Sequence, residues 1–474
     1  MKEYNKLYIN GEWREGHGEE QYNYNPYDGE LLYSYKSATK EDVDDAFEAA
    51  KEAQLFWNEI SPEQRRQHLK KLIPVLEKMQ DEIQECTLKE GGKVLSIGLR
   101  EHAGCMAALE NSLNYTSMLE GTLYQSFKFP GKDVLSYKDA KGVIGIVSPW
   151  NMPLALSTRL LFPALACGNT VVLKPSSDTP AIALLLAEAF DASGFPKGVF
   201  NVIVGKGSEI GDYFISHPIP AMHAFTGSSP VGRHIAELAG KELKDVALEL
   251  GGNNVMIVLS DADIERATDS AIIGKFTNSG QICMAINRFL VMDDVHDKFL
   301  EALLPKIKGL TVGNPELQGT VIGPLINAKQ VSEVEKLIKE TIDCGANVAL
   351  EGKTEGNVIY PWVFTEVTND MPIASSEVFG PIASIIRVNS EEDAVRLAND
   401  TEFGLSGCLW TDDVYSGMQI AKKIKTGNMH INDQPIFSES HIPFGGEKAS
   451  GMGRTGGRRF VDAFTTEKTI TFQK

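Results

Sequence analysis

Short runs of β-branched residues alternate with stretches of helical periodicity through the middle of the chain. The strand-like runs are Val143–Val147, Thr170–Lys174, Val199–Ile203 and Met222–Thr226, and the helical stretches lie near residues 153–166, 180–192, 209–216 and 230–239. This alternation predicts a doubly wound parallel sheet. Because such sheets bind ligands at the carboxyl ends of their strands, residues that directly follow these runs are candidates for a site.

A second alternating series begins at Asn254–Leu259 and continues to about residue 445. Two such series predict an α/β fold with two doubly wound domains and a ligand-binding cleft between them. The length of 474 residues agrees with more than one core. An Asn10-Gly11 hairpin and a helical layer over residues 39–90 should precede the first series. The last strand, over 465–472, would be an unpaired edge that a neighbouring subunit could pair with.

Charge and composition exclude several classes of partner. The 46 basic and 64 acidic residues give a formal net charge of -18, which argues against nucleic acid, because phosphate binding needs clustered cations. No apolar run approaches the roughly 20 residues that span a bilayer, so no membrane partner is expected. The cysteines, at positions 86, 105, 167, 283, 344 and 408, include no CxxC pair and are too sparse for a disulfide framework. With the polar start Met1–Lys6 they indicate a cytoplasmic protein, and no metal site is expected.

Cys283 and Glu249 carry the strongest chemical signal. Gly280 and Gln281 before Cys283 suggest an accessible loop, and Glu249 lies in another glycine-flanked turn. A thiolate can add to a carbonyl, and a carboxylate can activate the thiol or a water molecule. The apolar neighbours of Glu249 predict a raised pKa, which suits a base. The structural alternatives are a buried small hydrophobe, to which the other five cysteines are assigned, and a surface or helix-cap carboxylate.

Three further turns follow predicted strands. In the turn after Phe225, Gly227 would let the backbone approach a pyrophosphate at a helix N-terminus, although turn geometry explains Gly and Ser there about as well. Lys174 would place its ammonium at the nucleotide edge of the sheet, or simply be solvated. Asn151 could stabilise a developing oxyanion, with an ordinary helix cap as the alternative.

Seven motifs, in the same order, resemble the aldehyde dehydrogenase superfamily over essentially the whole chain. They are Pro149-Trp150-Asn151, Lys174-Pro175-Ser176, Phe225–Ser228, Glu249–Gly252, Gly280–Cys283, Glu377–Pro381 and Pro443–Gly446. The resemblance implies NAD(P)-dependent oxidation of an aldehyde to the carboxylic acid. Cys283 would attack the aldehyde as a thiolate and carry a thiohemiacetal and then a thioester. Asn151 and the Cys283 backbone N–H would hold the oxyanion, and Glu249 would activate the hydrolytic water.

The resemblance also assigns the cofactor contacts. They are Lys174 with Ser176 and Ser177 at the adenosine ribose, Gly227 and Ser228 at the pyrophosphate, Glu377 at the nicotinamide ribose, and Phe379 and Trp150 beside the nicotinamide. Family members strict for NAD often carry a glutamate where this chain has Ser177. Serine does not repel a 2′-phosphate, so we expect both NAD and NADP to be used. Thr455 stands where some relatives carry a glutamate suggested to relay protons, so any proton exit needs water or other groups.

The stretches His430–Gln434, His441–Gly446 and Gln281–Met284 are similar to the branch that oxidises benzaldehyde, vanillin and salicylaldehyde. An aromatic aldehyde is therefore the expected substrate. Ile282, Met284 and Phe444 would form an apolar slot that also suits a medium-chain aliphatic aldehyde or a semialdehyde. Arg159 would contact ring hydroxyls, unless it forms a surface salt bridge.

The same resemblance implies the domain limits. An NAD(P)-binding domain would cover 1–120 and 139–249, a catalytic domain 250–445, and an oligomerisation element 121–138 and 460–474, so a homodimer or homotetramer is expected. A CoA-acylating enzyme is an alternative that Glu249 argues against. A non-catalytic binding protein is another, and it would not need a thiol, a carboxylate and an amide together.

Overall fold

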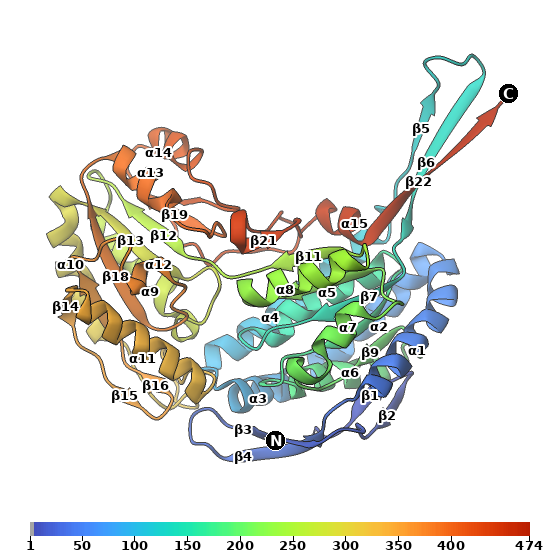
Figure 1. The fold of residues 1–474 in the computed structure, drawn as a ribbon, viewed down its shortest axis with the longest axis horizontal. Coiled ribbons are helices and arrows are strands. Elements are labelled where there is room, and N and C mark those ends of the chain that lie inside the picture. The colour runs from blue at the N-terminus through green and yellow to red at the C-terminus, as the bar shows by residue number, and fades with distance from the viewer. Residues whose placement is uncertain (1–3) are drawn as a thin grey trace.

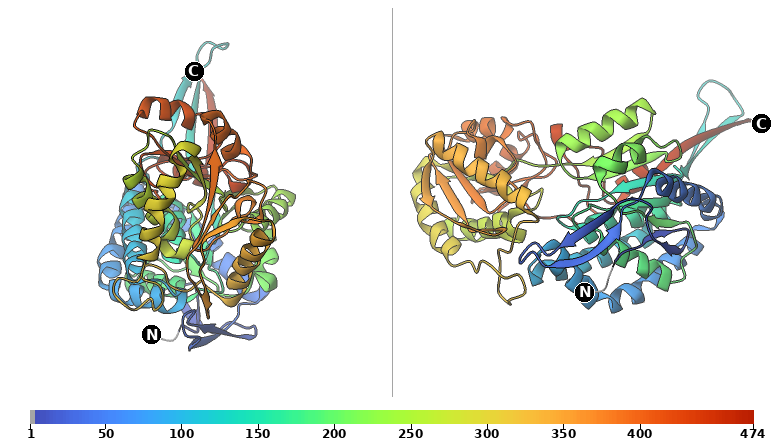
Figure 2. Two further views of the ribbon diagram at one scale, coloured as in Figure 1. Left: turned by 90° about the vertical axis from the view of Figure 1, so that its left-hand side faces the viewer. Right: turned by 60° about the horizontal axis from the view of Figure 1, so that its bottom comes forward.

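The computed structural model describes residues 4–474, which form two α/β units with a three-stranded arm projecting from the first (Figure 1, Figure 2). Residues 1–3 lie outside it, and with them the beginning of the polar amino terminus. Within the described chain, no helix combines the length and apolar character needed to cross a membrane.

The first unit is built on an eight-stranded sheet in the order β2-β1-β9-β8-β7-β10-β11-β21. Its strands are β1 (Leu7–Ile9), β2 (Glu12–Arg14), β7 (Val143–Val147), β8 (Thr170–Lys174), β9 (Phe200–Val202), β10 (Met222–Thr226), β11 (Asp245–Glu249) and β21 (Gly451–Met452). Strands β7 to β11 are parallel, and the chain moves from β7 through β8 to β9 before it returns to the other side of β7 with β10. The strand order reverses between β7 and β10, which is where open α/β sheets bind ligands.

Helices cover both faces of this sheet. They are α1 (Lys40–Glu59), α2 (Pro62–Lys78), α3 (Gln80–Gly91), α4 (Leu95–Tyr115), α5 (Pro153–Ala166), α6 (Ala181–Ala192), α7 (Asp212–Ser216), α8 (Ser229–Lys241) and α15 (Arg458–Phe464). Because crossovers are right-handed, α5 and α6 lie on one face and α7 and α8 on the other. Helices α2 to α4 form a second layer over α5 and α6. The layers share one apolar core that includes Trp57, Phe162 and Phe190.

The second unit has a seven-stranded sheet in the order β14-β17-β18-β13-β12-β19-β20. Its strands are β12 (Asn254–Val258), β13 (Ile286–Met292), β14 (Asn347–Leu350), β17 (Trp362–Thr365), β18 (Ile382–Val388), β19 (Gly407–Trp410) and β20 (His430–Ile431). The helices are α9 (Ile264–Phe276), α10 (Asp293–Lys308), α11 (Ala328–Asp343), α12 (Pro372–Ser375), α13 (Glu391–Asn399) and α14 (Val414–Ala421), and β15 (Thr354–Glu355) pairs with β16 (Val358–Ile359). Separate apolar clusters form on its two faces.

The chain returns to the first unit after the second is complete. Strand β21 pairs with β11, and Phe460 and Phe464 of α15 join the first core. The arm follows, with β22 (Thr465–Gln473) on β6 (Lys132–Ala140) and β6 on β5 (Thr122–Gln125). The terminal strand is thus confirmed, but it is paired with its own chain along one edge, and the prediction of an unpaired strand was wrong. The assignment of these parts to cofactor binding, catalysis and oligomerisation stays a prediction.

Most local predictions are confirmed. The hairpin turn at Asn10 and Gly11 has positive φ angles of 53° and 70°, as a tight turn between β1 and β2 requires. The helix expected near 209–216 is shorter, since Gly207–Gly211 forms a π-type turn before α7. Helix α4 and the hairpin of β3 (Glu20–Tyr24) with β4 (Leu31–Lys36) were not predicted.

Candidate active site

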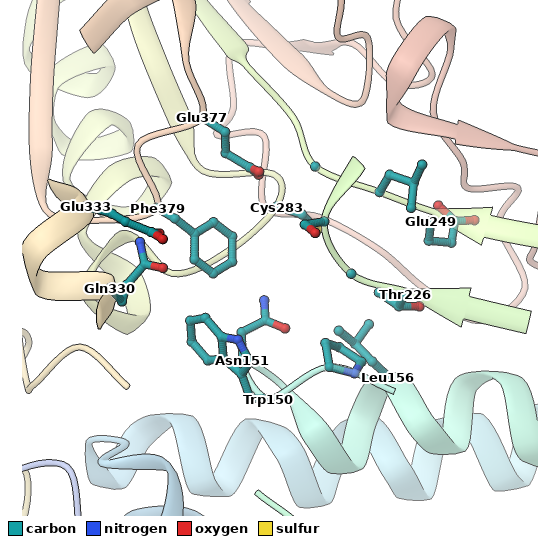
Figure 3. A pocket seen from close by; sticks show the side chains of 15 residues that line it. Trp150, Asn151, Leu156, Thr226, Glu249, Cys283, Gln330, Glu333, Glu377 and Phe379 are labelled. Carbon is teal, nitrogen blue, oxygen red and sulfur yellow. The ribbon is translucent and has the colours of Figure 1, made fainter. Parts of the chain in front are cut away.

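A cavity of about 240 Å³ lies at the point where the first sheet reverses its strand order. It is lined by Pro149, Trp150, Asn151, Leu156, Thr226, Gly227, Ser228, Glu249, Leu250, Gly251, Cys283, Gln330, Glu333, Glu377 and Phe379. Residues from the ends of β7, β10 and β11 thus face residues of the second unit across one space (Figure 3). The cleft predicted between two α/β units is confirmed.

The backbone before Cys283 is held in an unusual conformation. Asn278, Ser279 and Gly280 all have positive φ angles, of 54°, 57° and 76°. A Cβ atom on Gly280 would lie 2.3 Å from the carbonyl oxygen of Gly380, so only glycine fits there. Left-handed non-glycine residues cost free energy and persist where the surroundings fix them.

Gln281 supplies part of that support. Its side chain donates to the carbonyl oxygens of Asn278 and Pro324, at 3.2 and 3.3 Å, and accepts from the Ile326 N–H at 3.0 Å. Gln281 is buried, so the interpretation of an accessible loop was wrong for this residue, while Cys283 itself is half-buried. The loop is fixed by contacts on the side away from the cavity.

Asn254 fixes the backbone of the cysteine from the other side. Its Nδ2 donates to the carbonyl oxygens of Cys283 and Ala285, at 2.7 and 2.8 Å, and its Oδ1 accepts from the Ser406 N–H at 2.9 Å. Both the nitrogen and the oxygen of the Asn254 amide therefore bond to backbone groups. The Cys283 side chain is therefore presented to the cavity from a rigid support.

The electrostatic surroundings of Cys283 favour the neutral thiol. Burial, followed by the nearby carboxyl groups of Glu377 and Glu249, raises the pKa of Cys283 to about 12. These surroundings therefore do not favour the expected thiolate, and a base would have to accept the thiol proton before the sulfur could act as a nucleophile. Of the other cysteines, Cys344 is exposed, against the expectation of a buried residue, and the remaining four are buried.

The carboxyl group of Glu249 has the chemical character that such a base requires. Burial raises the pKa of Glu249 to about 7, while Arg159, Thr455 and Arg454 oppose the rise. The raised pKa predicted from its apolar neighbours is confirmed. The Thr455 hydroxyl donates to Glu249 Oε1 at 3.1 Å, and Glu249 Oε2 has no hydrogen-bond partner within residues 4–474. A carboxyl group with this pKa can exchange protons near neutral pH.

Asn151 lies between the end of β7 and the start of α5. Its Nδ2 donates to the Gln281 carbonyl oxygen at 3.1 Å, and its own carbonyl oxygen accepts from Asn278 Nδ2 at 3.2 Å. The amide is tied to the loop that carries Cys283 and lines the same cavity (Figure 3). It makes no helix-capping bond to α5, whose N-cap residue is Met152, so the alternative of an ordinary cap is wrong.

At the other end of the cavity, Glu377 accepts from the Gly252 N–H at 2.9 Å. Burial raises the pKa of Glu377 to about 7. A Cβ atom on Gly251 would lie 2.3 Å from Glu377 Oε2, so the glycine makes room for the carboxyl group. Phe379 meets Trp150 edge-to-face with ring centroids 5.4 Å apart, which brings one aromatic ring from each unit together.

Lys174, Ser176 and Ser177 lie at the end of β8, outside the residues that line this cavity. Lys174 is buried, which lowers its pKa to about 8, and its Nζ donates to the Pro175 carbonyl oxygen at 3.4 Å. The alternative of a solvated lysine is wrong. Ser176 Oγ contacts Asp178, and Ser177 is half-buried beside it.

These features fit a nicotinamide dinucleotide. The cavity lies at the reversal of strand order, and α8 begins at its wall directly after Gly227 and Ser228. Among the described residues, the side chain of Ser228, the N-cap residue of α8, makes no capping bond, so the first amides of the helix are left for an anionic group. The space beside Gly251 holds the carboxyl group of Glu377, which is the residue expected to bind the nicotinamide ribose.

A second cavity of about 410 Å³ opens on the other side of Cys283 and Glu249. Arg159, Ile282, Met284 and Phe444 all line it, as expected for the substrate pocket. Arg159 Nη1 donates to Ser438 Oγ at 2.8 Å, and its guanidinium lies 5.2 Å from the Phe444 ring centroid. Nη2 is buried without a partner in the part of the chain that is described, and no carboxylate is within salt-bridge distance there, so the surface ion pair is wrong.

Several lining residues were not predicted. They are Leu156, Thr226, Gln330 and Glu333 in the first cavity, and Ile97, Arg100, Gly104, Ala107, Asn111, Ser438, Glu439, Ser440 and His441 among those in the second. Arg100, Gly104, Ala107 and Asn111 follow one another at spacings of four, three and four residues along α4. That spacing indicates a helix, but a stripe of polar and small residues is not found by a search for apolar periodicity.

Comparisons with known proteins agree with this geometry. A profile of the aldehyde dehydrogenase family matches residues 13–470. A vanillin dehydrogenase of Corynebacterium glutamicum is 42% identical over 473 residues, which cover 99% of this chain and 98% of the relative. The crystal structure of an NAD-dependent benzaldehyde dehydrogenase from Corynebacterium glutamicum matches with a TM-score of 0.91 and 40% identity, over 99% of this chain and 97% of the other.

A structure described as an E. coli NADP-dependent enzyme matches with a TM-score of 0.97 and 34% identity, over 99% of this chain and 98% of the other. The fold and these full-length matches define an oxidoreductase of the α/β class. The chain belongs to the aldehyde dehydrogenase family.

Proposed function

We propose that this protein oxidises aromatic aldehydes to carboxylic acids with NAD or NADP, using Cys283 as nucleophile. The observation that carries the proposal is the position of Cys283 and Glu249, which line both the nucleotide cavity and the apolar second cavity. A substrate carbonyl in the second cavity would therefore meet the thiol, the base and the cofactor end of the cleft at one point.

In the first step the Cys283 sulfur forms a bond to the carbonyl carbon while Glu249 accepts the thiol proton. The carbonyl oxygen becomes an oxyanion, which Asn151 Nδ2 and the Cys283 N–H stabilise. A preorganised donor of this kind typically contributes about 3 kcal/mol to the transition state. A bound nicotinamide supplies the hydride acceptor. Glu249 must release the thiol proton to solvent before hydrolysis. Water then loses a proton to Glu249 and attacks the acyl carbon, the carbon–sulfur bond breaks to release the carboxylic acid, and Glu249 returns the proton to the Cys283 sulfur.

The side chains that would hold the cofactor are those at the ends of β7, β8 and β10. Ser228 and the N-terminus of α8 would bind the pyrophosphate, Glu377 the nicotinamide ribose, and Lys174 with Ser176 the adenosine ribose. Ser177 would leave the 2′-position free of a carboxylate, which supports use of both cofactors. The NAD-dependent and NADP-dependent relatives above agree with that choice.

Arg159 would select for oxygen-bearing rings. Arg159 lines the second cavity with Ile282, Met284 and Phe444, and its Nη2 is buried without a hydrogen-bond partner among the described residues. A phenolic hydroxyl that accepts a hydrogen bond from it would relieve the unpaired donor. The similarity to a vanillin dehydrogenase and a benzaldehyde dehydrogenase supports an aromatic rather than an aliphatic substrate.

The deciding experiment is a turnover panel of benzaldehyde, vanillin, salicylaldehyde, hexanal and succinic semialdehyde, each with NAD and with NADP. We expect the highest kcat/KM for the aromatic aldehydes, with both cofactors active and the free acid as product whether or not CoA is present. Cys283→Ala should abolish turnover, and Cys344→Ala, at an exposed cysteine, should not alter it. Full activity of Cys283→Ala would disprove the mechanism.

The arm supports a homodimer or homotetramer as a further part of the proposal. Leu123, Tyr124, Phe127 and Phe472 expose apolar surface on β5, β22 and the connecting loop. Sedimentation equilibrium would reveal the assembly, and a monomer would contradict it. We place the protein in the cytoplasm because its cysteines are few and unpaired.

A further inference from the structure

Lys93 carries a buried ammonium group behind the wall of the nucleotide cavity. It follows α3, is 1% exposed, and places its Nζ 5.2 Å from the centroid of the Trp150 ring. Trp150 lines the cavity, whereas Lys93 does not. In the described chain, Lys93 Nζ has no hydrogen-bond partner. Burying an ammonium group in this way is unfavourable, so its surroundings must compensate for the lost hydration.

Three groups provide that compensation. The indole of Trp150 offers its negative face to the ammonium. The carboxyl groups of Glu101, on α4, and Asp178, after β8, also attract it. Burial lowers the pKa of Lys93 to about 8, and these two carboxyl groups limit the fall, so the side chain is still mainly charged at neutral pH.

Each carboxyl group has another partner, and Glu101 Oε1 is buried without a hydrogen-bond partner among the described residues. Glu101 Oε2 accepts from the Ala155 N–H at 2.7 Å, in the first turn of α5. Asp178 Oδ1 accepts from Asn327 Nδ2 of the second unit at 3.0 Å. Neither is within salt-bridge distance of Lys93 among the residues described. The face of the Trp150 ring is therefore the direct contact of the Lys93 ammonium within residues 4–474.

The side chain of Lys93 is also fixed sterically. A Cβ atom on Gly91 would lie 3.0 Å from Lys93 Cγ and 3.0 Å from Cε, so the lysine runs close along the glycine. Gly92, with φ 61°, ends α3, and a Cβ atom there would lie 2.7 Å from Pro324 Cγ in the second unit. The segment 91–93 therefore lies against Pro324 of the second unit.

We propose that Lys93 is a positioning residue for the cofactor, whose ammonium holds the Trp150 indole against Phe379 at the nicotinamide end of the cavity. The two rings come from different units and meet edge-to-face, so a fixed indole also fixes the relation of the units at this point. Asn151 follows Trp150 directly, but its amide is held independently by the Gln281 carbonyl. Loss of Lys93 should therefore weaken cofactor binding more than it slows the reaction. The inference rests on the proposed function, because the wall matters only when a nicotinamide cofactor occupies the cavity.

The test compares Lys93→Met, which removes the charge and keeps the length, with Lys93→Arg, which keeps a cation. Calorimetric titration with NADH should show a Kd about tenfold higher in Lys93→Met, and Lys93→Arg should recover most of the affinity. The KM for NAD should rise by a similar factor, while kcat at saturating cofactor should change less than twofold. Arg266→Met is the matched control, because Arg266 lies 5.5 Å from the ring of Trp410 in the second unit, away from both cavities, and its loss should leave Kd unchanged.

A double-mutant cycle shows whether Lys93 acts through the indole. In a Trp150→Leu background, Lys93→Met should raise the Kd for NADH less than twofold, because the contact is already absent. An undiminished tenfold effect in that background would overturn the proposal, as would an unchanged Kd in Lys93→Met alone. A parent protein that binds neither NADH nor NADPH would instead refute the proposed function.

If Lys93→Met shows no cooperative thermal unfolding, Gly91→Ala replaces it. The added methyl group presses on the Lys93 chain and keeps its charge, and Gly91 has no positive φ that would strain an alanine. We expect a Kd for NADH raised by at least threefold. An unaltered Kd in a folded Gly91→Ala protein would count against positioning by Lys93.

Discussion

Thr455 donates a hydrogen bond from Oγ1 to Oε1 of Glu249 over 3.1 Å, and its backbone N–H and carbonyl pair with those of Phe444 at 2.8 and 2.7 Å. The proposed base is therefore held by a residue that enters the site only after the chain has left the second unit. From the sequence, Thr455 was noted as the absence of a second carboxylate. In the structure, Thr455 donates a hydrogen bond to Glu249, and this bond opposes the rise in the Glu249 pKa.

Thr455→Val should move the pH dependence of turnover. The hydroxyl favours ionised Glu249 and lowers its pKa, so its removal should raise that pKa further above about 7. Less carboxylate is then present at pH 7, and the acid limb of the kcat profile should shift to higher pH by about one unit. Profiles between pH 5.5 and 9 measure this. Thr268→Val, in α9 with its hydroxyl bonded to backbone carbonyls, serves as control, and an equal shift there would contradict the assignment.

Gly251→Ala should weaken cofactor binding. Its methyl group would lie 2.3 Å from Glu377 Oε2, so the carboxyl group must move and lose its bond from the Gly252 N–H. We expect the KM for NAD to rise about tenfold, the effect of losing roughly one charged hydrogen bond. Gly240→Ala, in α8 with open space around it, should leave the KM unchanged and stabilise the protein by about 1 kcal/mol. Unchanged KM in a folded Gly251→Ala variant would show that Glu377 does not bind the ribose.

Arg159→Met should alter substrate choice rather than catalysis in general. If Nη2 binds a ring hydroxyl, the kcat/KM for a hydroxylated benzaldehyde should fall roughly tenfold or more, because a hydrogen bond to a charged donor is lost. Unsubstituted benzaldehyde lacks that group and should be affected less than threefold. Steady-state kinetics with both substrates provide the ratio. A parallel loss for both would mean that Arg159 supports Phe444 and Ser438 instead.

Glu90 should make thermal stability depend on pH. Burial raises the pKa of Glu90 to about 8, although the Ala181 N–H at 3.0 Å and the Tyr33 hydroxyl bond to it. The folded state therefore keeps a proton that the unfolded chain loses near pH 4.5, and stability falls as pH rises from about 4.5 to 8. Glu90→Gln cannot titrate, so its Tm should fall less between pH 5 and 8. Calorimetry at both pH values tests this, and identical slopes in the two proteins would exclude the effect.

The first sheet could be predicted because its strands are continuous β-branched runs, such as Thr170–Lys174, which are buried on both faces. Asn151 was found by the same argument, since it follows such a strand. Glu249 was found instead from its glycine-flanked turn, and strand β11, which it ends, was not predicted. Helix α4 was missed because residues such as Arg100 and Gly104 carry no apolar periodicity, although they line the second cavity. A site wall of this kind is not distinguished from a solvated helix face by sequence alone.

The charge state of Cys283 could not be predicted either. Its pKa depends first on burial and then on Glu377 and Glu249, which approach it only when β11 and the loop before β18 meet across the cleft. Local sequence shows glycines and small residues around the thiol, and these suggest reactivity. The contact of Lys93 with Trp150 is long-range in the same sense, because nothing near either residue in the chain points to the other.

The path of the chain through the two units has a consequence for biosynthesis. Strand β21, helix α15 and strand β22 belong to the first unit but are translated after the whole second unit. A nascent polypeptide can complete the later unit while the earlier one still exposes the open edges of β11 and β6. Ribosomes that stall before residue 451 would thus release a product whose second unit is complete and whose first unit has unpaired strand edges. Such truncated products should aggregate.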